Sequence, residues 1–124
     1  MDFPKNLLYT KDHEWILFEE QHAFIGITDF AQRELGDIVF LDIPTLDQVI
    51  EKESVFGTVE AVKTVSDLYM PITGKIIELN NLLWENPDLV NKKPYDSWII
   101  KAELDAPADR SNLLSAEQYQ QLVQ

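Results

Sequence analysis

The sequence has 124 residues, with 10 Lys or Arg against 22 Asp or Glu, and its formal net charge at pH 7 is −12. This length suits one domain spanning residues 1–124, and a hydrophobic content of 45 % supplies a core. The negative charge argues against nucleic-acid or membrane-surface partners, and the lack of cysteine excludes disulfides and thiolate chemistry.

The first half of the chain is predicted to form short strands. Apolar runs at residues 15–18 and 23–27 flank a polar stretch, which predicts a hairpin. Thr28 or Asp29 can cap a short helix that runs through Glu34, with Gly36 as its stop signal. Further β-rich runs follow at residues 38–43, 54–60, 66–70, 74–79 and 98–102.

The hydrophobic period changes near the end of the chain. Ser115 and Gln118 resemble a capping box, and Tyr119, Leu122 and Val123 follow at helical spacing. Short strands at intervals of roughly 10 residues, followed by a C-terminal helix, predict a mainly β sandwich or barrel.

An internal repeat accompanies this pattern. Residues 68–71 echo residues 41–44, both ending in proline, and residues 76–78 echo residues 49–51. The echo suggests two similar β units related by a pseudo-twofold axis, joined by a segment that contains Lys63.

The usual catalytic signatures are absent from the sequence. Four glycines form no phosphate-binding loop, and no serine lies in a nucleophile motif. Asp12, His13 and Glu14 are able to ligate a metal, but they lack the His-x-x-x-His spacing, so local packing of His13 is the favoured interpretation. The residues alone therefore offer no recognisable catalytic motif, and no metal site is expected at residues 12–14.

The informative segment is residues 56–71, where two β-rich arms meet around Lys63. An ammonium group is costly to bury, so this lysine should point into water. A lysine at such a bend usually serves solubility. The alternative is an attachment point, where an amide with a long prosthetic group turns the side chain into a neutral tether. Local composition does not choose between the two.

At this point the chain resembles the H protein of the glycine cleavage system. The resemblance covers nearly the whole chain, in order, and rests on five blocks: residues 9–15, 26–32, 35–40 and 60–63, and residues 89–91 with Pro94 and Tyr95. It implies a barrel-sandwich hybrid of two small β-sheets with short helices, including the C-terminal helix. It also implies a carrier rather than an enzyme.

The resemblance places a covalent lipoyl group on Lys63, attached by a lipoate ligase or lipoyl transferase. The implied partners are a pyridoxal-phosphate glycine decarboxylase, a tetrahydrofolate-dependent aminomethyltransferase and dihydrolipoamide dehydrogenase, between which the arm shuttles the aminomethyl group of glycine. We expect a monomer. No apolar run approaches the roughly 20 residues of a membrane span, and the N-terminus lacks a signal-peptide layout, so we expect a cytoplasmic protein.

The family's acidic cleft for the loaded arm maps onto Asp12, Glu14 and Asp67. A carboxylate there would form a charge-assisted hydrogen bond with the amine of the arm. The alternative is that Asp12 caps a turn and Asp67 is a solvated side chain. Glu60 is the candidate for recognition by the lipoate-attaching enzyme, because it precedes Lys63 on the same hairpin; its alternative is also a solvated carboxylate.

The chain departs from the family pattern in several places. Ala61 and Thr64 replace the usual Ser and Ala, and the loops at residues 19–22, 45–48 and 94–98 lack the usual glycines. We expect the backbones of these loops to be re-routed, because residues other than glycine do not reach positive φ cheaply. Two other functions stay open: a lipoate relay or other lipoyl carrier, and an acidic β-rich binding module with an unmodified Lys63.

Overall fold

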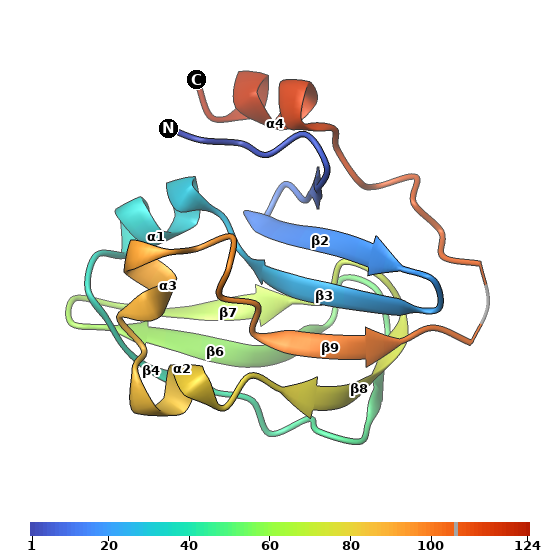
Figure 1. Ribbon diagram of the computed structural model, residues 1–124, viewed down its shortest axis with the longest axis horizontal. Helices are drawn as coiled ribbons and strands as arrows, with labels where there is room; N and C mark the ends of the chain where they lie inside the picture. Colours follow the sequence, from blue (N-terminus) through green and yellow to red (C-terminus); the bar gives the residue numbers. More distant parts are fainter. Residues whose placement is uncertain (106) are drawn as a thin grey trace.

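The computed structural model describes residues 1–105 and 107–124, and its strands form two antiparallel sheets (Figure 1). The larger sheet has the order β1 (Leu8–Tyr9), β2 (Glu14–Glu19), β3 (His22–Ile27), β9 (Ile100–Glu103), β8 (Gly74–Leu79) and β5 (Val49–Ile50). The smaller sheet has the order β4 (Ile38–Asp42), β6 (Val55–Ala61) and β7 (Val65–Tyr69). Four short helices complete the fold: α1 (Asp29–Leu35), α2 (Leu82–Glu85), α3 (Leu89–Lys92) and α4 (Ala116–Leu122). The predicted mainly β fold with a C-terminal helix is confirmed.

The core lies between the two sheets, because alternate residues of each strand point inward. In the smaller sheet Leu41, Val59 and Leu68 are buried, and they join one cluster with Ile25 and Ile100 of the larger sheet. The intervening residues of the smaller sheet face outward. This alternation is what lets the strands next to Lys63 bury one face and expose the other.

The predicted elements are all present, most of them with ends shifted by one or two residues. The run at residues 98–102 begins as a strand only at Ile100, since Trp98 and Ile99 precede β9. Thr28 caps α1 and Ser115 forms the predicted capping box of α4. The sequence did not predict β1, β5, α2 and α3, because two-residue strands and four-residue helices are too short to establish a hydrophobic period.

The internal repeat corresponds to equivalent positions in the fold. The chain leaves β4 at the smaller sheet, passes Pro44 and enters β5 of the larger sheet; it leaves β7, passes Pro71 and enters β8. β4 and β7 flank β6 on its two sides, and β5 pairs with β8. Residues 41–44 and 68–71 thus make the same crossing from one sheet to the other.

The premise that the glycine-poor loops avoid positive φ is wrong for two of them. Glu20, in the turn between β2 and β3, has φ 58°, and Asp47, in the loop after Pro44, has φ 69°. Both loops therefore contain a left-handed residue although neither has glycine there, and re-routing relative to the family stays a prediction. Strand pairing on either side of the β2–β3 turn, with Glu19 opposite His22, imposes this conformation.

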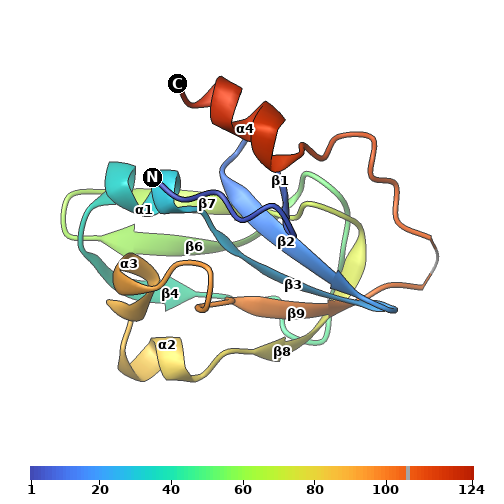
Figure 2. The same cartoon turned by 45° about the horizontal axis from the view of Figure 1, so that its top comes forward.

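Two structural features surround the sheets. α1 and α3 lie at the end where the β6–β7 hairpin turns, and α4 lies beside the N-terminal segment (Figure 2). Phe3, Tyr9 and Tyr119 join these terminal segments through aromatic contacts. Within the described residues, none of the helices has the length and apolar character needed to cross a membrane.

Candidate functional site

Lys63 lies at the tip of the β6–β7 hairpin with its side chain exposed. The Ala61 N–H donates to the Thr64 carbonyl oxygen across 2.8 Å, which closes the turn. The Val62 N–H donates to the Asp37 carbonyl oxygen across 2.9 Å, which ties the tip to the segment between α1 and β4. Lys63 therefore extends into water from a backbone that is held on both sides.

The segment beside the hairpin is itself fixed by Asn91 of α3. The Asn91 Nδ2 donates to the Gly36 carbonyl oxygen at 2.8 Å, and its Oδ1 accepts from the Ile38 N–H at 3.0 Å. Gly36 has φ 77°, and a methyl group built on it would lie 3.2 Å from Lys63 Cε. The absence of a side chain at Gly36 leaves room for the Lys63 stem to lie across the end of α1.

A cavity of about 120 Å³ opens close to this end of α1. Its lining residues come from the β1–β2 turn, from the start of β2, from the end of β3 and from α1, β6 and β7: Asp12, His13, Glu14, Ile27, Ala31, Glu34, Leu35, Val59, Ser66, Asp67 and Leu68. The structure thus brings together Asp12, Glu14 and Asp67, the three residues assigned from the sequence to an acidic cleft. Apolar walls with carboxylates at the edge suit a small apolar group that carries a cation.

Glu14 is the most buried of these carboxylates, at 2 % exposure. Its Oε1 accepts from the Thr10 hydroxyl at 2.7 Å, and its Oε2 accepts from the Tyr69 N–H at 3.3 Å. Burial raises the pKa of Glu14 to about 8, and these two hydrogen bonds oppose that rise. A cation that entered the cavity would favour the charged carboxylate and lower this pKa again.

Thr10, which the sequence did not single out, caps the turn, a role that the alternative interpretation gave to Asp12. The Thr10 hydroxyl oxygen accepts from the Glu14 N–H at 3.1 Å and its proton goes to the Glu14 carboxylate. A threonine followed four residues later by a glutamate was the available signal. Asp12 is left with its side chain at the cavity.

Glu60 lies away from the cavity, on the outer face of the smaller sheet. It is paired with Phe40 on one side and Val65 on the other, and these side chains are 47 % and 61 % exposed. Val62, beside Lys63, is 76 % exposed. Sequence reasoning missed this apolar surface around the hairpin, because valine and phenylalanine in a strand predict core.

His13 is held by packing and a hydrogen bond, in agreement with the favoured interpretation. Its Nδ1 lies 2.8 Å from the Tyr119 hydroxyl, its ring packs on Phe30, and burial lowers its pKa. Among the described residues no cluster of His, Cys, Asp or Glu has the arrangement of a metal site.

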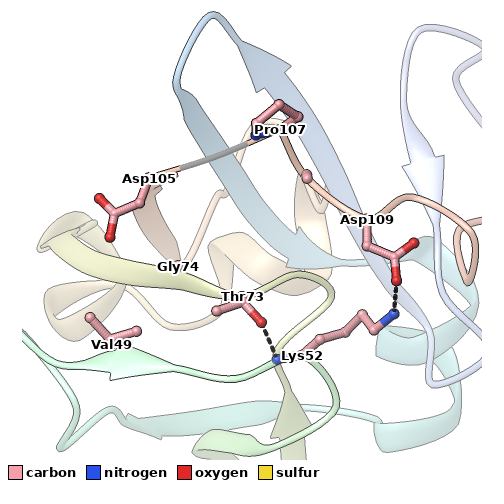
Figure 3. A pocket seen from close by; sticks show the side chains of 8 residues that line it. Val49, Lys52, Thr73, Gly74, Asp105, Pro107 and Asp109 are labelled. Atoms are coloured by element: carbon pink, nitrogen blue, oxygen red, sulfur yellow. Dashed lines mark hydrogen bonds and ion pairs between the residues drawn. The ribbon is translucent and has the colours of Figure 1, made fainter.

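A second cavity, of about 300 Å³, lies at the other end of the fold and contains none of the residues predicted for the site (Figure 3). The Lys52 ammonium donates to Asp109 Oδ2 at 2.7 Å, and the Lys52 N–H donates to the Thr73 hydroxyl at 3.0 Å. Lys52 is paired with Asp109 and Asp105 adds a second carboxylate, so the described lining presents no unpaired cation to an anionic ligand.

Comparison with known proteins identifies relatives along the whole chain. The family model described as glycine cleavage H-protein matches residues 7–124. A glycine cleavage system H protein of Bacteroides fragilis is 53 % identical over 124 residues, covering 99 % of this chain and 98 % of that protein. That of Bacteroides thetaiotaomicron is 54 % identical over 127 residues, with the same coverage. The crystal structure of a glycine cleavage system H protein from Mycobacterium marinum superposes with a TM-score of 0.84 at 33 % identity, covering 94 % of each chain.

Proposed function

The chain belongs to the glycine cleavage H-protein family, and we propose on this premise that Lys63 carries its lipoyl group as an amide. The protein is the lipoyl carrier of the glycine cleavage system, and its fold is the barrel-sandwich hybrid of that family. When bound, the group supplies a disulfide that accepts the aminomethyl group of glycine. The residues of the chain have to present the arm, receive its loaded end and keep water from it.

The observation that carries this proposal is the position of Lys63. Its exposed side chain lies beside Gly36, which directly follows Glu34 and Leu35, two residues that line the cavity. An arm attached to Lys63 therefore starts beside the end of α1 whose residues Glu34 and Leu35 line the cavity. Within the described residues Lys63 forms no ion pair, so amide formation removes its charge without breaking one.

The cavity supports the proposal that Asp12, Glu14 and Asp67 hold the loaded end of the arm. Ile27, Ala31 and the other apolar walls suit the hydrocarbon part, and the carboxylates are placed to accept hydrogen bonds from an ammonium group. These walls surround part of the cavity and would limit the access of water to a labile cargo.

The partner enzymes are part of the proposal. They are a pyridoxal-phosphate glycine decarboxylase, a tetrahydrofolate-dependent aminomethyltransferase, dihydrolipoamide dehydrogenase and the ligase or transferase that attaches lipoate, with Glu60 as a recognition residue for the last. The chain itself performs no catalysis in this scheme. One domain over residues 1–124, a monomeric state and a cytoplasmic location stay predictions.

The decisive experiment measures the intact mass of the protein before and after incubation with lipoate, ATP and a lipoate ligase. We expect the parent to gain one lipoyl group and Lys63→Arg, which keeps the charge, to gain none. An equal gain in mass by both proteins would show that lipoate is attached to another lysine. Glycine decarboxylase turnover with the lipoylated parent then separates a cleavage carrier from a lipoate relay, which would support no turnover.

A further inference from the structure

The C-terminal helix contacts a wall of the arm cavity through the side chain of Tyr119, whose ring meets the His13 imidazole edge-on. The Tyr119 hydroxyl lies 2.8 Å from His13 Nδ1 and 2.7 Å from the Thr28 hydroxyl. His13 lines the cavity, and Thr28 caps α1, which supplies Ala31 and other lining residues. Tyr119 is not among the described lining residues. We propose that Tyr119 is a positioning residue that holds two walls of the arm cavity together from behind, an inference that rests on the proposed function.

The tyrosine is placed by α4 and by aromatic packing, independently of the cavity. Its side chain is fully buried, its ring stacks on Tyr9 at 4.9 Å and 8°, and Phe3 meets it edge-on at 5.4 Å. Upstream of the capped α4, Leu114 exchanges backbone hydrogen bonds of 2.9 and 2.7 Å with Tyr9. These contacts fix the Tyr119 hydroxyl between His13 on one wall and Thr28 on the other.

The hydrogen bonds at this point form a continuous chain. The Ala31 N–H donates to the Thr28 hydroxyl oxygen at 3.1 Å, which leaves the Thr28 proton free to donate to the Tyr119 oxygen. The Tyr119 proton then goes to His13 Nδ1, which accepts it in the neutral imidazole. Burial lowers the pKa of His13 and raises that of Tyr119, so both groups are neutral at pH 7.

The wall that contains His13 needs such a restraint. His13 has φ 72°, a conformation that costs a residue other than glycine on the order of 1 kcal/mol and persists only where the surroundings impose it. Its backbone is held by the Thr28 N–H, which donates to the His13 carbonyl oxygen at 3.0 Å. The side chain is held by Tyr119. Without the hydroxyl, the turn carrying Asp12 keeps the backbone hydrogen bond to Thr28 and the packing of the His13 ring on Phe30, but the imidazole loses the hydrogen bond that fixes its orientation.

The test compares two variants that each lose one hydroxyl from the same aromatic stack. Tyr119→Phe removes the bridge to His13 and Thr28, whereas Tyr9→Phe removes a hydroxyl that donates to the Pro4 carbonyl oxygen at 2.6 Å. In the unlipoylated protein we expect Tyr119→Phe to move the NMR signals of the His13 imidazole and of the amides at residues 12–14 and 28–35. Tyr9→Phe should leave these signals in place. Equal changes in both variants would mean general loosening of α4 and would overturn the proposal.

The second readout follows the loaded arm. Water converts the aminomethyl thioether to a thiol, formaldehyde and ammonia, as the C–S and C–N bonds break and a C=O bond forms. We expect Tyr119→Phe to release formaldehyde about fivefold faster than the parent, the ratio that corresponds to loss of the one hydrogen bond that holds His13 in the cavity wall. Tyr9→Phe should match the parent, and lipoylation of Lys63 should be unchanged in both.

The outcomes separate the two proposals. A parent that takes up lipoate yet releases formaldehyde as fast as loaded dihydrolipoamide would refute the cavity as the arm site and this role of Tyr119 with it. A parent that protects its cargo, with Tyr119→Phe protecting equally well, would refute the role of Tyr119 alone. Absence of lipoylation on Lys63 would refute the proposed function, and the imidazole signals would still decide whether Tyr119 positions His13.

Discussion

Glu14 connects β2 to β7 while lying in the wall of the arm cavity. At 2 % exposure its charged form loses most of its hydration, and this is why its pKa rises from 4.5 to about 8. Since the folded protein binds a proton that the unfolded chain has released, the contribution of Glu14 to stability is complete below about pH 4.5 and is lost as the pH rises through about 8.

We therefore predict that Glu14→Gln flattens the pH dependence of stability. Between about pH 5 and 8 the free energy of unfolding of the parent should fall by up to about 1.4 kcal/mol per pH unit more than that of the variant. Urea unfolding at several pH values measures both slopes. Parallel slopes would show that Glu14 titrates normally in the folded protein.

Glu20 is the residue where a local substitution should stabilise the fold. Its φ of 58° costs a side chain with a Cβ on the order of 1 kcal/mol, and glycine removes that cost. We expect Glu20→Gly to raise the free energy of unfolding by about 0.5 kcal/mol in urea titrations, after the entropy gained by the unfolded chain is subtracted. Glu19→Gly, in the extended β2, should lower it; stabilisation by both would point to relief of acidic repulsion instead.

At the scale of elements, α3 supports the lysine hairpin through one side chain. Asn91 donates to Gly36 and to Gln32 Oε1 and accepts from Ile38, so Asn91→Ala leaves several polar groups unpaired. We expect a loss of about 1–3 kcal/mol in stability. Hydrogen exchange should also quicken at the Val62 amide, whose acceptor Asp37 follows Gly36.

The matched control for this prediction is Asn81→Ala. Asn81 precedes α2 and its side chain makes no capping hydrogen bond, so its removal should leave both stability and exchange at Val62 nearly unchanged. If Asn91→Ala destabilised the protein without quickening exchange at Val62, α3 would support the core and not the hairpin.

The outer face of the smaller sheet continues up to the turn that carries Lys63, because β6 and β7 are the two strands of that hairpin. An enzyme that attaches lipoate has to bring Lys63 into its active site, and the exposed Val65 and Phe40 then lie under its surface. We expect Val65→Thr to raise the KM for lipoylation about threefold, since part of a buried valine's transfer energy is lost. Val49→Thr, equally exposed at 60 % but on β5, should leave the KM unchanged; equal effects would argue against docking at this face.

How far the sequence predicted the fold depended on the length of each element. β8 was predicted at its observed bounds because its six residues form an apolar-rich run long enough to recognise, although its pairing register shifts between Ile76 and Glu78. β1 and β5 were missed because their two residues are strands only through pairing with β2 and β8. The left-handed Glu20 and Asp47 were missed for a related reason: tertiary pairing overrode the local preference against positive φ.

The candidate site also contains residues that the sequence predicted and residues that it did not. Lys63 and the three acids were assigned from a family resemblance, and the structure brings the acids into one cavity. Tyr119 and Asn91 received no role at that cavity or hairpin, because their partners His13 and Gly36 are distant in sequence. Hydrogen bonds between such segments leave no periodic trace in the chain.

At the scale of the whole molecule, the net charge of −12 opposes the compact state through repulsion among carboxylates. Salt screens this repulsion but also weakens ion pairs such as Lys5–Glu117 and Lys92–Asp88. These pairs are exposed, and exposed pairs contribute about 0–1 kcal/mol each, so repulsion should dominate.

We therefore predict that the melting temperature at pH 7 rises with sodium chloride, by roughly 3–5 °C for about 1 kcal/mol of relieved repulsion. Scanning calorimetry at low and at high salt measures the rise. Near pH 5 the net charge is smaller, because the isoelectric point is about 4.3, and the rise should shrink accordingly. A melting temperature that fell with salt at pH 7 would mean that ion pairs, and foremost the 2.7 Å pair between Lys52 and Asp109, outweigh the repulsion of the excess carboxylates.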